Sequence, residues 1–70
     1  MYNMLTERQR EVLVLVAKGY KNEQIADELI ITLSTVKAHV SEIYRTLNVS
    51  GRVQASILGI KLGIISLDEI

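Results

Sequence analysis

A short run of small polar and basic residues is the part of this chain best suited to chemistry. On a helical wheel, one side collects Ser34, Lys37, Ala38, Ser41 and Arg45. Short side chains let a helix backbone approach the edges of bases, and long cationic side chains donate hydrogen bonds to bases and phosphates. This combination predicts a helix that enters the major groove of DNA.

The other side of the same segment is apolar. Val36, Val40, Ile43 and Leu47 recur at the spacing of a buried helix stripe. A shorter amphipathic segment precedes this helix, and a break of about four residues separates the two. Two helices joined by such a break have the form of a helix-turn-helix. We therefore expect residues 34 to 45 to form the outer face of the second helix of such a motif.

Helix-capping residues predict two further helices around this pair. Thr6 and Gln9 have capping-box spacing, and Thr32 can cap the helix that follows it. Gly19 and Asn48 stand where helices end in a left-handed conformation. The predicted helices cover residues of about 7–18, 23–29, 33–47 and 51–62. The expected fold class is all-α, a compact four-helix domain with a central helix-turn-helix that occupies residues 1–70.

Two further cap positions and one ion pair are predicted. Asn22 is the expected cap of the second helix, and Ser50 is that of the fourth. Arg52 is interpreted either as a phosphate clamp or as a partner of Glu11, and the structural pairing is favoured.

Composition excludes several classes of protein. The chain has 70 residues, of which 49% are apolar and 23% charged, with no cysteine, so it is one small globular domain without disulfides. No apolar run reaches the roughly 20 residues that span a bilayer, and we expect a cytoplasmic protein. His39 is the lone histidine, and neither metal-ligand spacing nor a glycine-rich phosphate loop is present. Neither an enzyme nor a cofactor is expected.

Charge is unevenly distributed along a neutral chain. The formal net charge is zero, whereas DNA-binding domains are usually basic. Residues 32–61 nevertheless contain four basic side chains against Glu42 alone. Positive charge is thus concentrated on the segment predicted to meet DNA, and a modest non-specific affinity is expected.

A dispersed set of residues between about Leu5 and Ile64 has a recognisable spacing, which is densest at Thr35-Val36-Lys37 and His39-Val40. The set also includes Leu5-Thr6, Arg8, Arg10-Glu11-Val12-Leu13, Gly19, Asn22, Ile25-Ala26, Leu29, Ile31, Ile43, Leu47, Val49, Arg52, Ala55 and Gly63. With these residues the chain resembles the LuxR/GerE-type DNA-binding domain, the output module of NarL-like response regulators and of quorum-sensing regulators.

The resemblance implies roles for individual residues. Lys37 would donate to a base edge, with Ala38 and Ser41 lining the groove beside it. Thr35 and His39 would contact or orient toward phosphate, and for His39 a purely structural role remains equally open. Taken together, the outer face of the helix and the resemblance predict that the DNA-binding residues are Ser34, Thr35, Lys37, Ala38, His39, Ser41, Arg45 and Lys21.

The fourth predicted helix is apolar around more of its circumference than one core face requires. The resemblance implies that this helix pairs two domains on DNA, and we expect a homodimer interface at Val53, Ile57, Ile60 and Ile64. Alternatively, the short loop before this helix, together with Tyr2 and Met4 from the N-terminal segment, covers these residues.

The sequence thus predicts a sequence-specific DNA-binding domain of a bacterial transcription regulator that acts as a dimer. A receiver or sensor domain is expected outside this chain. The alternative is a helical protein-interaction module with the same fold and little DNA affinity, which net neutrality and Glu42 favour. The salt dependence of binding to random duplex discriminates between the two.

Overall fold

The computed structural model describes residues 4–70, which form four α-helices and a short C-terminal 3-10 helix. The helices are α1 (Glu7–Ala17), α2 (Asn22–Leu29), α3 (Leu33–Leu47) and α4 (Arg52–Lys61). Each begins and ends within one residue of the range predicted from the sequence. The 3-10 turn η1 (Leu67–Glu69) was not predicted. The all-α fold class is confirmed.

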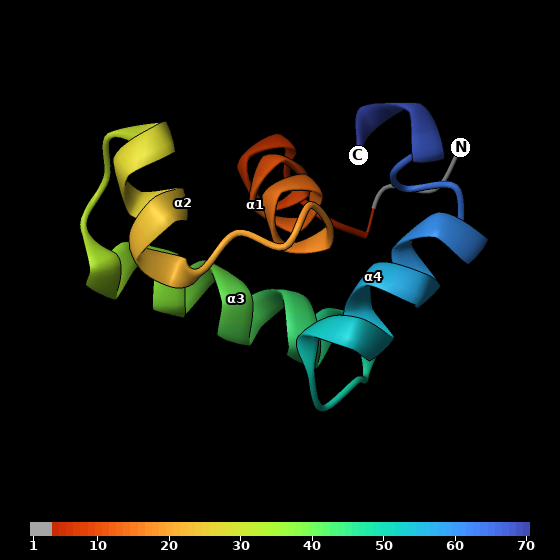
Figure 1. Ribbon diagram of the computed structural model, residues 1–70. Coiled ribbons are helices and arrows are strands. Elements are labelled where there is room, and N and C mark those ends of the chain that lie inside the picture. The colour runs from red at the N-terminus through yellow and green to blue at the C-terminus, as the bar shows by residue number, and fades with distance from the viewer. Residues whose placement is uncertain (1–3) are drawn as a thin grey trace.

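The longest helix, α3, forms the base on which the other helices pack. In Figure 1, α2 lies over the start of α3, α1 is seen nearly end-on above its middle, and α4 lies beside its end. All four helices contribute to one core, with Leu13, Ile25, Val36, Ile43 and Ala55 almost fully buried. Because α3 is covered on one side only, its opposite side is left exposed.

Helices α1 and α3 begin as the sequence predicts. The Thr6 hydroxyl accepts from the Gln9 N–H at 3.1 Å, and the Gln9 side chain accepts from the Thr6 N–H. The Thr32 hydroxyl likewise accepts from the Thr35 N–H at 3.1 Å. These bonds satisfy donors that a helix leaves unpaired in its first turn.

The two other predicted caps are wrong. Lys21, one residue before Asn22, occupies the N-cap of α2, and its N–H donates to Gln24 Oε1 at 2.8 Å. At α4 the N-cap is Gly51, not Ser50. The Ser50 N–H and hydroxyl both donate to Gln54 Oε1, so Ser50 fixes the loop from just outside the helix.

Left-handed residues end α2 and α3. Asn48 has φ 56° and ψ 49° at the end of α3, as predicted, and Gly19 has φ 92° after α1. At the end of α2 the left-handed residue is Ile30, with φ 57° and ψ 50°. Such a conformation is unfavourable for a β-branched side chain, and the sequence did not predict it.

A turn at Gly63 folds the C-terminal segment back toward α1. Gly63 has φ 74°, and the next N–H, that of Ile64, donates to Gly59 O at 2.9 Å. Ile64 and Ile65 are consequently buried in the core. Arg10 Nε donates to Ile64 O at 3.1 Å, and this arginine also forms an ion pair with Glu69. The end of the chain is thereby attached to α1.

Arg52 does not pair with Glu11. Its guanidinium donates to Tyr20 O at 2.6 Å and to Asn22 Oδ1 at 3.2 Å, which ties the start of α4 to the loop between α1 and α2. Glu11 instead pairs with Arg8, one turn earlier on α1, at 3.2 Å. The predicted pair is wrong because Arg52 begins its helix beside this loop.

Candidate nucleic-acid interface

The exposed side of α3 brings together most of the residues predicted to bind DNA. Ser34, Thr35, Lys37, Ala38, Ser41 and Arg45 are all exposed. The four residues predicted as the apolar stripe of this helix are all buried. The helix is therefore held by one face and offers the other to a partner, as groove insertion requires.

Two of these predicted contacts have protein partners. The Thr35 and Thr32 hydroxyls lie 2.9 Å apart and share a hydrogen bond at the start of α3. Arg45 forms an ion pair with Glu42, three residues earlier on the same helix. Lys37 is not in any of the ion pairs formed by residues 4–70, so its ammonium group needs no protein contact to be broken before it binds.

His39 and Lys21 lie at the margins of this face. His39 is half-buried, between the core side and the exposed side of α3. Lys21 is exposed at the N-cap of α2.

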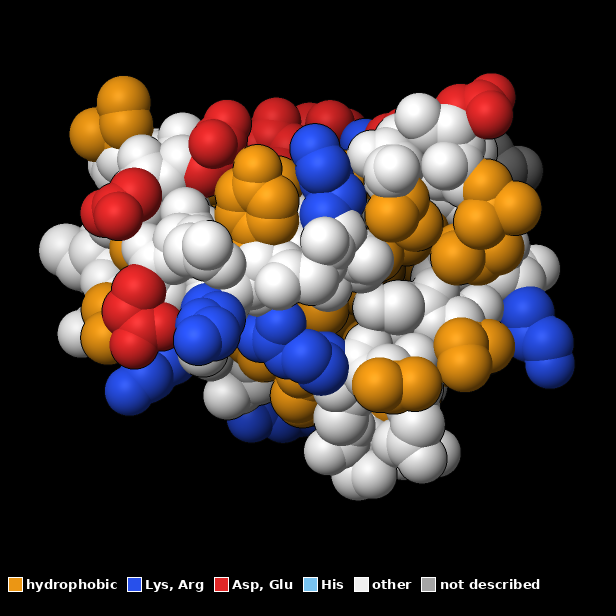
Figure 2. Space-filling model, viewed as in Figure 1, with side chains coloured by type: hydrophobic (Ala, Val, Ile, Leu, Met, Phe, Trp, Pro, Cys, Tyr) orange, Lys and Arg blue, Asp and Glu red, His pale blue; other side chains and the backbone are white. Residues whose placement is uncertain are grey.

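Charge is segregated on the surface. Figure 2 shows Lys and Arg side chains mainly over the lower half of the molecule, where Figure 1 places α3 and the start of α2. Asp and Glu side chains line the upper and left edges of the same view. A neutral chain thus presents a positively charged side, which is the distribution that phosphate binding requires.

The predicted dimer patch on α4 is smaller than expected. Val53 and Ile57 are 69% and 52% exposed, whereas Ile60 is half-buried against the core. Ile64 is only 9% exposed and is not a surface residue, because the turn at Gly63 directs it inward. Of the residues suggested as a cover, Met4 is itself exposed, and Tyr2 lies outside the described residues.

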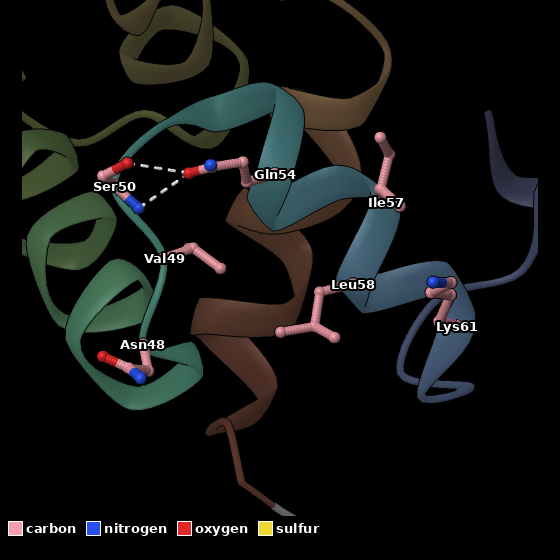
Figure 3. Close-up of a pocket in the computed structure, with 7 residues that line it drawn as sticks. All are labelled: Asn48, Val49, Ser50, Gln54, Ile57, Leu58 and Lys61. Carbon is pink, nitrogen blue, oxygen red and sulfur yellow. Dashed lines mark hydrogen bonds between the residues drawn. The ribbon is translucent and has the colours of Figure 1, made fainter.

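A hollow of about 500 Å³ lies next to Ile57, between α4 and the loop that follows α3. Figure 3 shows Val49 and Leu58 within it, the bonded pair Ser50 and Gln54 at one end and Lys61 at the other. Ile57 points away from Val49 and Leu58 at its rim. The sequence did not predict this hollow, because it arises from how the α3–α4 loop meets α4.

Comparison with known proteins agrees with this geometry. Residues 3–58 match the family model described as bacterial regulatory proteins, luxR family. Curated relatives include the response regulator protein VraR of Staphylococcus aureus and that of Staphylococcus epidermidis, each 54% identical over 57 residues. The match covers 81% of this chain and 27% of each relative, so the chain spans about a quarter of their length. A solved structure, that of the transcription factor GerE, superposes with a TM-score of 0.87 at 39% identity, over 96% of this chain and 100% of that one.

The fold and its exposed helix define a helix-turn-helix DNA-binding domain of the transcription-regulator class. The chain belongs to the luxR family of bacterial regulatory proteins. Among residues 4–70, no helix is long and apolar enough to cross a membrane.

Proposed function

We propose that this domain binds DNA sequence-specifically by inserting α3 into the major groove, and that two copies bind together through α4. The observation that carries the groove proposal is the exposed side of α3, where small side chains alternate with cations while the opposite stripe is buried. Lys37 and Ala38 lie side by side on it, so a long donor stands next to a side chain too short to hold the helix away from the bases.

Phosphate contacts are assigned to the rim of this side. Lys21 and Arg45 supply charge, whereas Thr35 and His39 supply hydrogen-bonding groups near the start and edge of α3. Such contacts fix the register of the helix on the duplex and leave base-edge contacts to specify the sequence.

Salt dependence tests the proposal at the level of the whole surface. Binding to random duplex is measured at increasing salt concentration, and the logarithm of the affinity should fall linearly with the logarithm of salt as counterions are released. Binding without a salt slope, or no binding to duplex, would favour the alternative of a helical protein-interaction module.

Lys37→Ala tests base recognition within that surface. Loss of a base-edge donor should cost about 1–3 kcal/mol on the selected site and relax the preference at one position in each half-site. Arg8→Ala is the matched control, since it removes one positive charge from α1, where Arg8 pairs with Glu11. Equal weakening on all sequences would make Lys37 a phosphate contact instead.

The dimer proposal rests on the exposed apolar residues of α4. Val53 and Ile57 lie one turn apart on its outer side, and the hollow beside Ile57 offers a place for a side chain of a second copy. A two-fold arrangement brings the same patch from both chains together. Because the patch is small, self-association should be weak in solution and strengthened by two half-sites on one duplex.

The signal that controls binding is assigned to a segment or partner outside these residues. The relatives named as response regulators are about four times as long as the matched region, and we propose that this domain is the output part of a comparable regulator in the cytoplasm.

A further inference from the structure

Glu42 is an unusual residue for the middle of a helix that meets DNA. It is exposed on α3 and is the only acidic residue between positions 32 and 61. It follows Ala38 by one helical turn, so the two residues lie on the same side of the helix. If α3 enters the groove, a carboxylate at this position is repelled by the phosphates of the duplex whatever the base sequence.

The structure shows how this charge is compensated. Arg45 lies one turn after Glu42 and forms an ion pair with it, and both side chains remain well exposed, at 75% and 50%. The guanidinium therefore neutralises the carboxylate without removing it from the surface. An arginine has five N–H donors, so Arg45 can hold Glu42 and still donate to DNA.

The chemistry of the major groove decides what such a carboxylate can bind. A carboxylate only accepts hydrogen bonds, and the groove offers two amino donors, cytosine N4 and adenine N6. At adenine the N7 on the same base is an acceptor and repels the carboxylate, whereas cytosine has no acceptor on its own ring beside the amino group in the major groove.

We propose that Glu42 is a specificity-determining residue that accepts a hydrogen bond from the N4 amino group of a cytosine, with Arg45 positioning and neutralising its carboxylate. This inference rests on the proposed insertion of α3 into the groove. The charge of Glu42 weakens binding to DNA in general. At a half-site with cytosine in the contacted position, the hydrogen bond to N4 offsets this loss, so Glu42 favours such half-sites over all others.

Selection of bound sites from a random duplex library, followed by affinity measurements on single-base variants of the selected site, tests the proposal. The parent should require cytosine at one position of each half-site, with a loss of about fivefold or more on replacement. Glu42→Ala should abolish that preference and bind random duplex more tightly. Glu42→Gln should shift the preference at the same position toward adenine, because an amide both accepts from N6 and donates to N7.

Glu28→Gln provides the control for net charge. Glu28 is exposed on α2 and lines a second hollow together with Arg10, Glu11 and Glu69, and no residue of α3 lines that hollow. This variant should leave the base preferences unchanged.

The outcomes separate this inference from the proposed function. If the parent does not distinguish its selected site from random duplex, the proposal that α3 recognises bases is wrong, and so is the proposed role of Glu42. If the parent is selective but both Glu42 variants keep all its preferences and only bind every duplex more tightly, then Glu42 merely repels DNA and this inference alone is overturned.

Discussion

Ile30 is the residue whose backbone conformation fits its side chain least well. It is left-handed at the end of α2, and its side chain is 90% exposed, so no burial compensates the strain. Asn48 adopts almost the same angles at the end of α3, and asparagine tolerates them far better. Ile30→Asn should therefore stabilise the domain by about 1 kcal/mol, measured by urea unfolding.

The reciprocal variant is the matched control for Ile30. Asn48→Ile places a β-branched residue in the same conformation at another exposed position, and it should destabilise by a similar amount. If Ile30→Asn lowers stability, the Ile30 side chain makes a contact that its exposure does not reveal.

Glu69 makes stability depend on pH. A hydrogen bond from the Ser66 N–H, and then the Arg10 guanidinium, lower the pKa of this carboxyl below its ordinary value of 4.5. A carboxyl group whose pKa is lowered by folding stabilises the folded state at pH values above its ordinary pKa. This stabilisation is lost as the pH falls through the folded-state pKa. Glu69→Gln should therefore be less stable than the parent at neutral pH, and the two should converge as pH drops below 4.5. A difference that persists unchanged in acid would show that packing of η1, not charge, causes it.

Single residues also mark the limit of what the sequence predicts. The caps at Thr6 and Thr32 were predictable because their partners lie three residues away. The bonds of Arg52 to Tyr20 and Asn22 join positions about 30 apart. They depend on how α4 meets the α1–α2 loop, which local spacing does not determine.

At the scale of the helices, α4 packs tightly against α1 at Gly59. A Cβ atom at this position would lie 2.9 Å from Leu13 Cδ2, and Leu13 is fully buried. Gly59→Ala should therefore destabilise by about 1–3 kcal/mol, although alanine favours a helix, because the core must shift to admit one methyl group. Thermal and urea unfolding measure the loss.

A double-mutant cycle identifies the cause of that loss. Leu13→Ala creates space beside Gly59, so the double variant should cost less than the sum of the two single variants. Additive losses would place the strain elsewhere, for example at Ile65, which lies 3.5 Å from the same Cβ position.

Helix positions were easier to predict than the faces that helices expose. The apolar period of α3 separates its buried and outer sides correctly. On α4 the period is ambiguous, since apolar residues occur all around it, and Ile64 follows a turn that reverses the chain. A helical wheel cannot represent such a reversal, which is why Ile64 was wrongly placed on the surface.

At the scale of the whole molecule, a net charge of zero conceals two sides of opposite sign. The basic side coincides with α3 and the start of α2, and acidic side chains line the upper and left edges of the view in Figure 2. Such a dipole would orient the domain as it approaches DNA, with α3, the helix proposed to bind it, directed at the duplex. Sequence alone indicated the segment in which cations gather, and the fold places that segment on one side.

The proposed pairing of two copies concerns the whole molecule, and a single substitution tests it. Ile57 is exposed beside Val53 on α4 and makes no contribution to the buried core. Ile57→Glu should leave the monomer folded, because the new carboxylate reaches water. It should abolish cooperative binding to a duplex with two half-sites, since two carboxylates would meet across the two-fold axis.

Leu67→Glu is the matched control for this variant, because it makes the same kind of change at an exposed apolar residue of η1, outside α4. Both variants should bind a single half-site equally, since each adds the same negative charge. A second half-site on the same duplex holds two copies close together and so raises the affinity of a protein whose copies pair. Only Ile57→Glu should lose this gain in affinity. If Ile57→Glu binds the paired site as cooperatively as Leu67→Glu does, the two copies meet through a surface other than α4.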